Sequence, residues 1–145
     1  MRVVLDTNVL LSGLLIAHGP PAKLLDAWER ALFTLVASNA LIAEFREVAS
    51  RSFFKARLRA SVVEVLAAGL RDFSLFYQDL PSGPKAPDPK DSHLLALAEA
   101  SAAEFLVTGD KELQSLKHHK SSRIVSPAAM MNVVKEAEKE GEGEE

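Results

Sequence analysis

Four carboxylates stand where an acid calls for an explanation: Asp6, Glu44, Asp91 and Asp110. Asp6 directly follows three apolar residues, two of them β-branched, that are typical of a short buried strand. Asp110 follows a second such run, Asp91 stands at an expected helix start, and Glu44 lies beside the apolar stripe of a helix. Carboxylates that are brought together repel one another unless a cation joins them. The pattern therefore predicts a cation site.

The donor atoms indicate which cation this would be. The chain has no cysteine, and none of its four histidines forms a pair spaced for a metal. Oxygen ligands alone favour Mg²⁺ or Mn²⁺ over zinc. Mg²⁺ usually keeps several waters and binds through one or two carboxylates together with substrate phosphates. This is the arrangement used for metal-assisted hydrolysis of a phosphodiester.

Each acid also has a plainer interpretation. Asp6 and Asp110 could cap the helices that follow them, and Glu44 could form an ion pair at the edge of its helix. Asp91 could interact favourably with a helix dipole, a stabilisation of about 0.3–1 kcal/mol. We interpret Asp88 first as an N-cap, because a proline follows it, and second as a site residue. Each alternative is reasonable for a single acid. It is much less reasonable that all four acids lie on one edge of the sheet by accident.

The order of the expected elements decides where these acids meet. Helical patterns alternate with short apolar runs that we interpret as strands at residues 2–6, 33–37, 74–77, 105–107 and 124–125. This alternation predicts an α/β fold with a mainly parallel sheet of about five strands. Strand ends and the helix starts that follow them share one edge of such a sheet, and ligands bind there.

Two further stretches are distinctive. Residues 51–59 contain four cations and two phenylalanines, a mixture that can serve nucleic-acid contacts. We favour the simpler interpretation, in which the phenylalanines belong to the core and the charges to a solvated face. Residues 78–90 form an expected polar loop with four prolines and one glycine.

Composition limits the remaining possibilities. At 145 residues, of which 48% are apolar, the chain is long enough for one packed domain. We place this domain at residues 1–134 and expect residues 135–145 to be an acidic, frayed tail. The chain carries −3 and the tail −4, so the body carries +1, or +5 with the four acids neutralised by metal. That is compatible with a phosphate-backbone partner.

The motifs resemble those of PIN-domain proteins, of the kind found as toxins in bacterial and archaeal toxin–antitoxin pairs (VapC-like). The resemblance covers about residues 1–134 and includes Glu44 in the third expected helix. Its other matching stretches are Val3-Val4-Leu5-Asp6-Thr7-Asn8-Val9-Leu10, Asp88-Pro89-Lys90-Asp91-Ser92-His93-Leu94-Leu95-Ala96-Leu97-Ala98 and Phe105-Leu106-Val107-Thr108-Gly109-Asp110-Lys111-Glu112-Leu113.

The resemblance implies a three-layer α/β/α sandwich and a Mg²⁺- or Mn²⁺-dependent endoribonuclease. Asp6 and Asp91 would be the main metal ligands, and Glu44 and Asp110 would complete the acidic cluster. Polar groups that would steady these acids are Asn8 and Thr108, with Asp88 in the same motif. His93 is a weaker candidate for contact with substrate.

The resemblance also implies partners: an RNA substrate, an antitoxin protein and a second copy of the chain in a homodimer. We expect a cytoplasmic protein with no membrane segment, since no cysteine and no apolar run of about 20 residues is present. Three alternatives stay open: a housekeeping RNA-processing nuclease, a non-catalytic RNA- or protein-binding module, and a haloacid-dehalogenase-like phosphatase. The last normally needs a second aspartate where this chain has Asn8.

Overall fold

The computed structural model describes residues 1–80 and 86–143. Most of the expected loop over residues 78–90 is thereby described, but residues 81–85 lie outside the described residues. None of the helices that the structure describes is both long enough and apolar enough to cross a bilayer.

The sheet has six strands in the order β3-β2-β1-β4-β6-β5. The strand bounds are β1 Arg2–Leu5, β2 Thr34–Ser38, β3 Leu75–Tyr77, β4 Phe105–Val107, β5 His118–His119 and β6 Ser122–Val125. All neighbouring strands are parallel except β5 and β6. The chain moves from β1 outward to β2 and β3, and then returns to place β4 on the other side of β1. The direction in which successive strands are added to the sheet therefore reverses between β1 and β4. Open α/β sheets bind their ligands at such a point of reversal.

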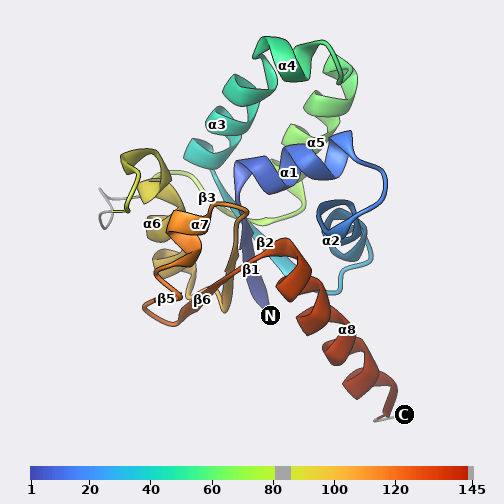
Figure 1. Ribbon diagram of the computed structural model, residues 1–145, viewed down its shortest axis with the longest axis vertical. Coiled ribbons are helices and arrows are strands. Elements are labelled where there is room, and N and C mark those ends of the chain that lie inside the picture. The colour runs from blue at the N-terminus through green and yellow to red at the C-terminus, as the bar shows by residue number, and fades with distance from the viewer. Residues whose placement is uncertain (81–85, 144–145) are drawn as a thin grey trace.

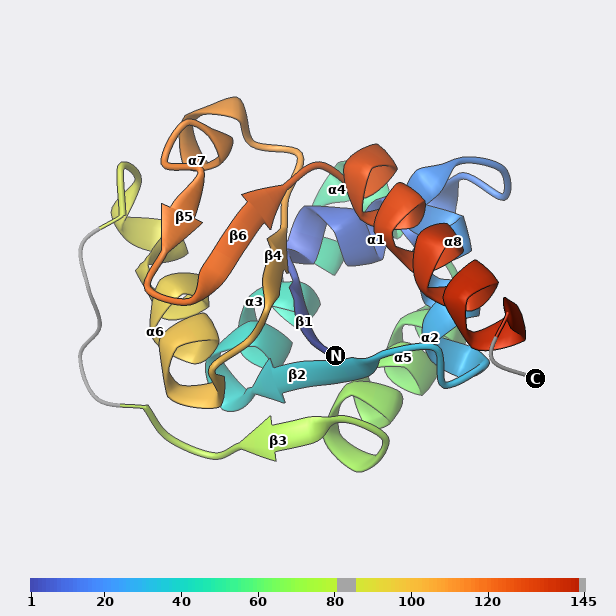
Figure 2. The same cartoon turned by 90° about the horizontal axis from the view of Figure 1, so that it is seen from below.

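Helices cover both faces of this sheet, which confirms the predicted α/β sandwich. The helix bounds are α1 Thr7–Leu15, α2 Pro20–Glu29, α3 Asn39–Ala49, α4 Ser52–Lys55, α5 Ala60–Asp72, α6 Ser92–Ser101, α7 Lys111–Gln114 and α8 Pro127–Gly143, with a 3₁₀ turn η1 at Pro89–Asp91. Figure 1 shows α3, α4 and α5 rising from one end of the sheet. Figure 2 shows α6 on one side of the sheet and α1, α2, α5 and α8 on the other.

The centre of the sheet is the centre of the core. Val3, Val4 and Leu5 are fully buried, because β1 has neighbours on both edges and helices on both faces. A parallel strand buried in this way is expected to read as a continuous apolar run. The register pairs Leu5 with Val107, so β1 and β4 end side by side. The polar residues that follow the two strands therefore emerge at the same edge.

The expectation of about five strands was one short, because β5 was missed. β5 and β6 form a hairpin whose two connecting residues are Lys120 and Ser121. Lys120 adopts a left-handed backbone, with φ of 53°. Two-residue hairpin turns can normally be predicted from a glycine or asparagine at such positions, and this turn has neither.

The acidic tail was expected to fray, and the structure describes residues 135–143 of it as helix. Helix α8 continues to Gly143, nine residues beyond Val134. Glu138 forms an ion pair with Arg30 next to α2, with 3.5 Å between nitrogen and oxygen. Residues 135–140 also contain alanine, glutamate and lysine, which are good helix formers. Both features favour continuation of the helix.

Candidate active site at the sheet edge

Asp6 is buried at the end of β1, with 4% of its surface exposed. One carboxylate oxygen, Oδ2, accepts a hydrogen bond of 2.7 Å from the Thr108 hydroxyl. The other, Oδ1, accepts a longer one of 3.4 Å from the backbone N–H of Asn8, and Asp6 is the N-cap of α1. The capping interpretation is therefore confirmed, and it does not conflict with the site interpretation, because a single carboxylate has oxygens for both.

Thr108 connects the two central strands at this edge. It is fully buried, and its hydroxyl both donates to Asp6 and accepts a 3.0 Å bond from the backbone N–H of Asp110. Asp110 in turn caps α7, where Oδ1 accepts from the backbone N–H of Glu112 at 2.8 Å. The Thr-Gly-Asp motif thus fixes the backbone of one acid and the side chain of another.

Glu44 reaches the same edge from α3 and is paired with a residue of α6. Its Oε2 lies 2.8 Å from Nε2 of His93, 49 positions away in the chain. His93 was a candidate for substrate contact, but the structure turns its ring toward Glu44. Its other ring nitrogen, Nδ1, is buried and has no hydrogen-bond partner in the described part of the chain. His93 therefore acts here as a support for Glu44.

Asp91 differs from the other aspartates in what its carboxylate does. Asp88 accepts a 3.0 Å bond from the backbone N–H of Lys90 and caps the 3₁₀ turn η1. The α-helix expected to begin at Pro89 begins three residues later, and Asp91 takes its N-cap position. Within the described residues, the Asp91 side chain makes no capping hydrogen bond. Its carboxylate is consequently available to a ligand.

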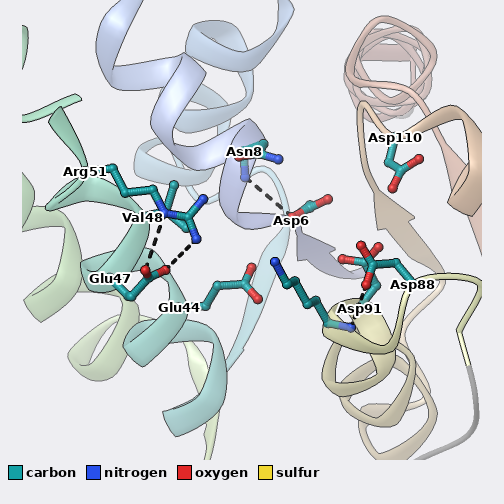
Figure 3. A pocket seen from close by; sticks show the side chains of 10 residues that line it. Asp6, Asn8, Glu44, Glu47, Val48, Arg51, Asp88, Asp91 and Asp110 are labelled. Carbon is teal, nitrogen blue, oxygen red and sulfur yellow. Dashed lines mark hydrogen bonds and ion pairs between the residues drawn. The ribbon is translucent and has the colours of Figure 1, made fainter. Parts of the chain in front are cut away.

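These acids line one cavity of about 550 Å³. Figure 3 shows Asp6, Glu44, Asp91 and Asp110 around it, contributed by four separate segments of the chain. The complete lining is Asp6, Asn8, Glu44, Glu47, Val48, Arg51, Asp88, Lys90, Asp91 and Asp110. All four acids singled out in the sequence are present, with Asn8 and Asp88. Thr108 lies behind Asp6 and steadies it. Asn8 supports Asp6 through its backbone N–H, which any residue but proline would supply.

The acids influence one another's ionisation. Burial, and then the charges of Asp6, Asp110, Asp88 and Glu44, raise the pKa of Asp91 to about 6. Burial also raises the pKa of Asp6, although its bonds from Thr108 and Asn8 oppose the rise. The negative charge in this cavity is thus only partly compensated by the protein itself.

The pKa of Glu44 moves in the opposite direction. Burial alone would raise it, but His93, the nearby Thr7 hydroxyl and the charge of Arg51 outweigh burial and lower it. Thr7 lies close to this carboxylate, yet its hydroxyl has no partner at ordinary hydrogen-bond geometry within the described residues. Glu44 is therefore held ionised, beside an Asp91 that is easily protonated.

Two cations of the lining, Arg51 and Lys90, were not predicted as site residues. Arg51 forms an ion pair of 2.9 Å with Glu47, an exposed acid of α3. Lys90 sits between two acids in the sequence, in the turn that Asp88 caps. The Asp-Pro-Lys-Asp stretch was noticed for its carboxylates alone, and a lysine within it offered no separate signal.

The chemistry of the lining fits a hard divalent cation. Six of the ten lining residues are acids, and all their ligand atoms are oxygens. Burial and, after it, the charges of neighbouring acids raise the pKa of Asp91, and a bound cation would offset both. Among residues 1–80 and 86–143, no three ligating side chains converge closely enough to enclose an ion by themselves. A closed site of protein ligands is not what Mg²⁺ requires, since it usually keeps several waters.

Comparison with known families gives a match that covers most of the chain. A family model described as PIN domain matches residues 2–112 of the chain. The matched range contains all four acids and ends within α7, the helix that Asp110 caps. A search of curated proteins finds no match to this chain.

Proposed function

Because the chain belongs to the PIN-domain family, which is a family of nucleases, we propose that it is a Mg²⁺- or Mn²⁺-dependent endoribonuclease. One observation carries the proposal: six carboxylates line a single cavity at the edge where β1 and β4 end. A cavity this acidic would repel a phosphate backbone unless a cation stood between them. The four-acid cluster is therefore better suited to metal-assisted hydrolysis than to simple binding of a polyanion.

The side chains divide the work according to their environments. Asp6 and Asp91 would hold the cation, and Glu44 and Asp110 would complete the negative shell around it. When bound, the cation supplies Lewis-acid stabilisation of the scissile phosphate and lowers the pKa of an attacking water. Thr108 holds the Asp6 carboxylate in one orientation, as His93 does for Glu44. Lys90 places a positive charge in the cavity for the phosphate group.

The test is cleavage of a mixed pool of single-stranded and structured RNA with Mg²⁺, with Mn²⁺ and with EDTA. We expect metal-dependent cutting that Asp6→Asn and Asp91→Asn each reduce at least about a hundredfold, because even changes to groups behind a metal ligand cost about 10–100-fold. Asp26→Asn, an exposed acid of α2 outside the cavity, is the matched control. No cleavage and no Mn²⁺ binding by the folded protein would leave a non-catalytic binding module instead.

A finer part of the proposal is that this nuclease is a toxin restrained by an antitoxin. It rests on the resemblance of the opening and Thr-Gly-Asp motifs. Induced expression of the wild type should arrest growth of a bacterial host, while Asp6→Asn should not. Normal growth with an enzyme that cuts RNA in vitro would favour housekeeping RNA processing. The proposed homodimer is tested separately, by the molar mass in solution.

A further inference from the structure

We propose that the segment around α4 binds the single-stranded RNA that flanks the cleavage site, by stacking a base and by contacting phosphates. We call this segment the basic ridge and define it as Arg51, Phe53, Lys55, Arg57 and Arg59. The inference extends the proposed function, because it assigns a surface for the substrate outside the cavity.

The ridge is apolar on its inner side and cationic on its outer side. Phe54 and Leu58, four residues apart, are partly buried and pack against the core. The five ridge residues alternate with them and are all exposed. Phe53 was expected to belong to the core, and this was wrong: 53% of its surface is exposed. The anchoring residues secure the segment, so Phe53 is free for another contact.

Phe53 and Arg57 form a composite platform. The Arg57 guanidinium lies 3.9 Å from the centre of the Phe53 ring and donates a 2.8 Å hydrogen bond to the Phe53 carbonyl. The Phe54 ring lies at 83° to the Phe53 ring, with 5.0 Å between ring centroids. These contacts fix the ring and the guanidinium before any ligand arrives. Aromatic rings and arginine planes are the surfaces on which unpaired RNA bases stack.

The charge of the ridge matches a polyanion. Residues 48–63 contain four cations and no acid. Arg51 is paired with Glu47, whereas Lys55, Arg57 and Arg59 have no carboxylate partner among the residues that the structure describes. Such clustered, uncompensated cations are the electrostatic footprint of nucleic-acid binding.

The ridge is continuous with the cavity, which favours RNA over an acidic peptide as the occupant. Arg51 both lines the cavity and immediately precedes α4. Figure 3 shows it beside Glu47 and Val48, on the α3 side of the acids. Figure 1 shows α4 at the far end of α3, linking it to α5. An RNA strand whose scissile phosphate lies in the cavity would therefore meet cations and a stacking surface where it leaves the cavity past Arg51 toward α4.

The test is binding of a fluorescein-labelled single-stranded RNA of about 12 nucleotides, followed by anisotropy in EDTA. EDTA removes the metal and so prevents cleavage, which keeps the RNA intact during the measurement. We expect Phe53→Ser to weaken binding about fivefold or more, the smallest loss typical of a stacked base. An oligonucleotide with abasic sites should bind the wild type and Phe53→Ser equally well. Phe73→Ser, which alters a phenylalanine 78% exposed at the end of α5, is the control.

Removal of charge gives an independent readout. The double variant Lys55→Gln/Arg57→Gln should lower the slope of log affinity against log salt by about 1.4, since each phosphate contact to a single strand contributes about 0.7. Lys23→Gln/Arg71→Gln removes two exposed charges outside the ridge and should leave the slope unchanged. Equal binding by the wild type and both ridge variants would overturn the proposal, as would displacement of the RNA by polyglutamate at equal charge. RNA binding that depends on the ridge, without any cleavage, would support the ridge proposal and contradict the proposed nuclease function.

Discussion

The cavity and the basic ridge adjoin at Arg51 and are built in opposite ways. The cavity acids are positioned by backbone N–H groups, a buried hydroxyl and a histidine, at strand ends and helix starts. The ridge cations lie on a short exposed segment, and two aromatic rings and one guanidinium supply its order. Carboxylates that must share a cation need fixed positions, whereas cations that follow a flexible strand need reach and exposure. The difference indicates that the cavity carries out the cleavage chemistry and that the basic ridge supplies affinity for the RNA.

The largest effect is expected from a variant that removes one of the hydrogen bonds holding the cavity acids in place. Thr108→Val keeps the shape of the buried side chain but removes the hydrogen bond to Asp6. We expect metal-dependent RNA cleavage to fall about 10–100-fold, as for other groups that orient a metal ligand, with RNA binding in EDTA unchanged. Thr34→Val, at an exposed threonine of β2, is the control. Full activity in Thr108→Val would show that the cavity needs no such support.

A second change removes the partner of Glu44. His93→Ala should lower kcat about tenfold with little change in KM, since a hydrogen bond to a charged group contributes about 1.5–3 kcal/mol. His93→Gln keeps a donor on a side chain of similar length and should recover most of that loss. In a Glu44→Gln background, His93→Ala should cost little more.

The chain offers a matched control for this experiment. His119 pairs with Glu99 at 3.1 Å, outside the cavity. His119→Ala should therefore leave cleavage unchanged. If His93→Gln behaves like His93→Ala, the histidine serves packing and does not position Glu44.

The repulsion within the cavity should appear as a dependence of stability on pH. The folded-state pKa of Asp91 is raised to about 6, so the folded protein binds this proton more tightly than the unfolded chain does. Stability should therefore fall as pH rises from about 4 through about 6, and Asp91→Asn should abolish that part of the fall. In EDTA we expect the variant to melt a few degrees above the wild type at about pH 8 and equally at about pH 4.

Added Mg²⁺ should reverse the ranking at about pH 8, because it stabilises the wild type by binding the folded state alone. Asp26→Asn should show neither effect. Equal melting temperatures of Asp91→Asn and the wild type at both pH values would mean that the acids are too well solvated to repel one another.

The smallest effect concerns the boundary between the two regions. Glu47→Gln frees Arg51 from its ion pair and removes one negative charge from the cavity lining. RNA binding in EDTA should tighten about two- to fivefold, while stability should change by less than about 1 kcal/mol because the pair is exposed. Glu64→Gln, which frees Arg46 from a similar pair outside the cavity, should not tighten binding. Unchanged RNA binding in Glu47→Gln would show that Arg51 does not contribute to RNA binding by the ridge.

Local features of the sequence predicted much of the fold. Ser38, a residue type that is common at helix starts, caps α3, with its hydroxyl accepting a 3.1 Å bond from the N–H of Leu41. β4 has the predicted bounds, and Pro20 begins α2. These features depend on residues a few positions apart, so their physics is present in any short window of the chain. β5 and the outward position of Phe53 were not predicted, because an unusual turn and a choice of helix face leave no such local signal.

The sequence by itself determined which residues could form the site: an acid after β1, another after β4, one at the start of α6 and one beside the apolar stripe of α3. It did so because short buried strands and helix caps have local signatures. The tertiary structure decided which of them support each other. Thr108 meets Asp6 across 102 positions and His93 meets Glu44 across 49, because the strand order places β4 beside β1 and packs α6 near α3. The raised pKa of Asp91 likewise depends on burial and on acids that are distant in the sequence, Asp6, Asp110 and Glu44, in addition to its neighbour Asp88.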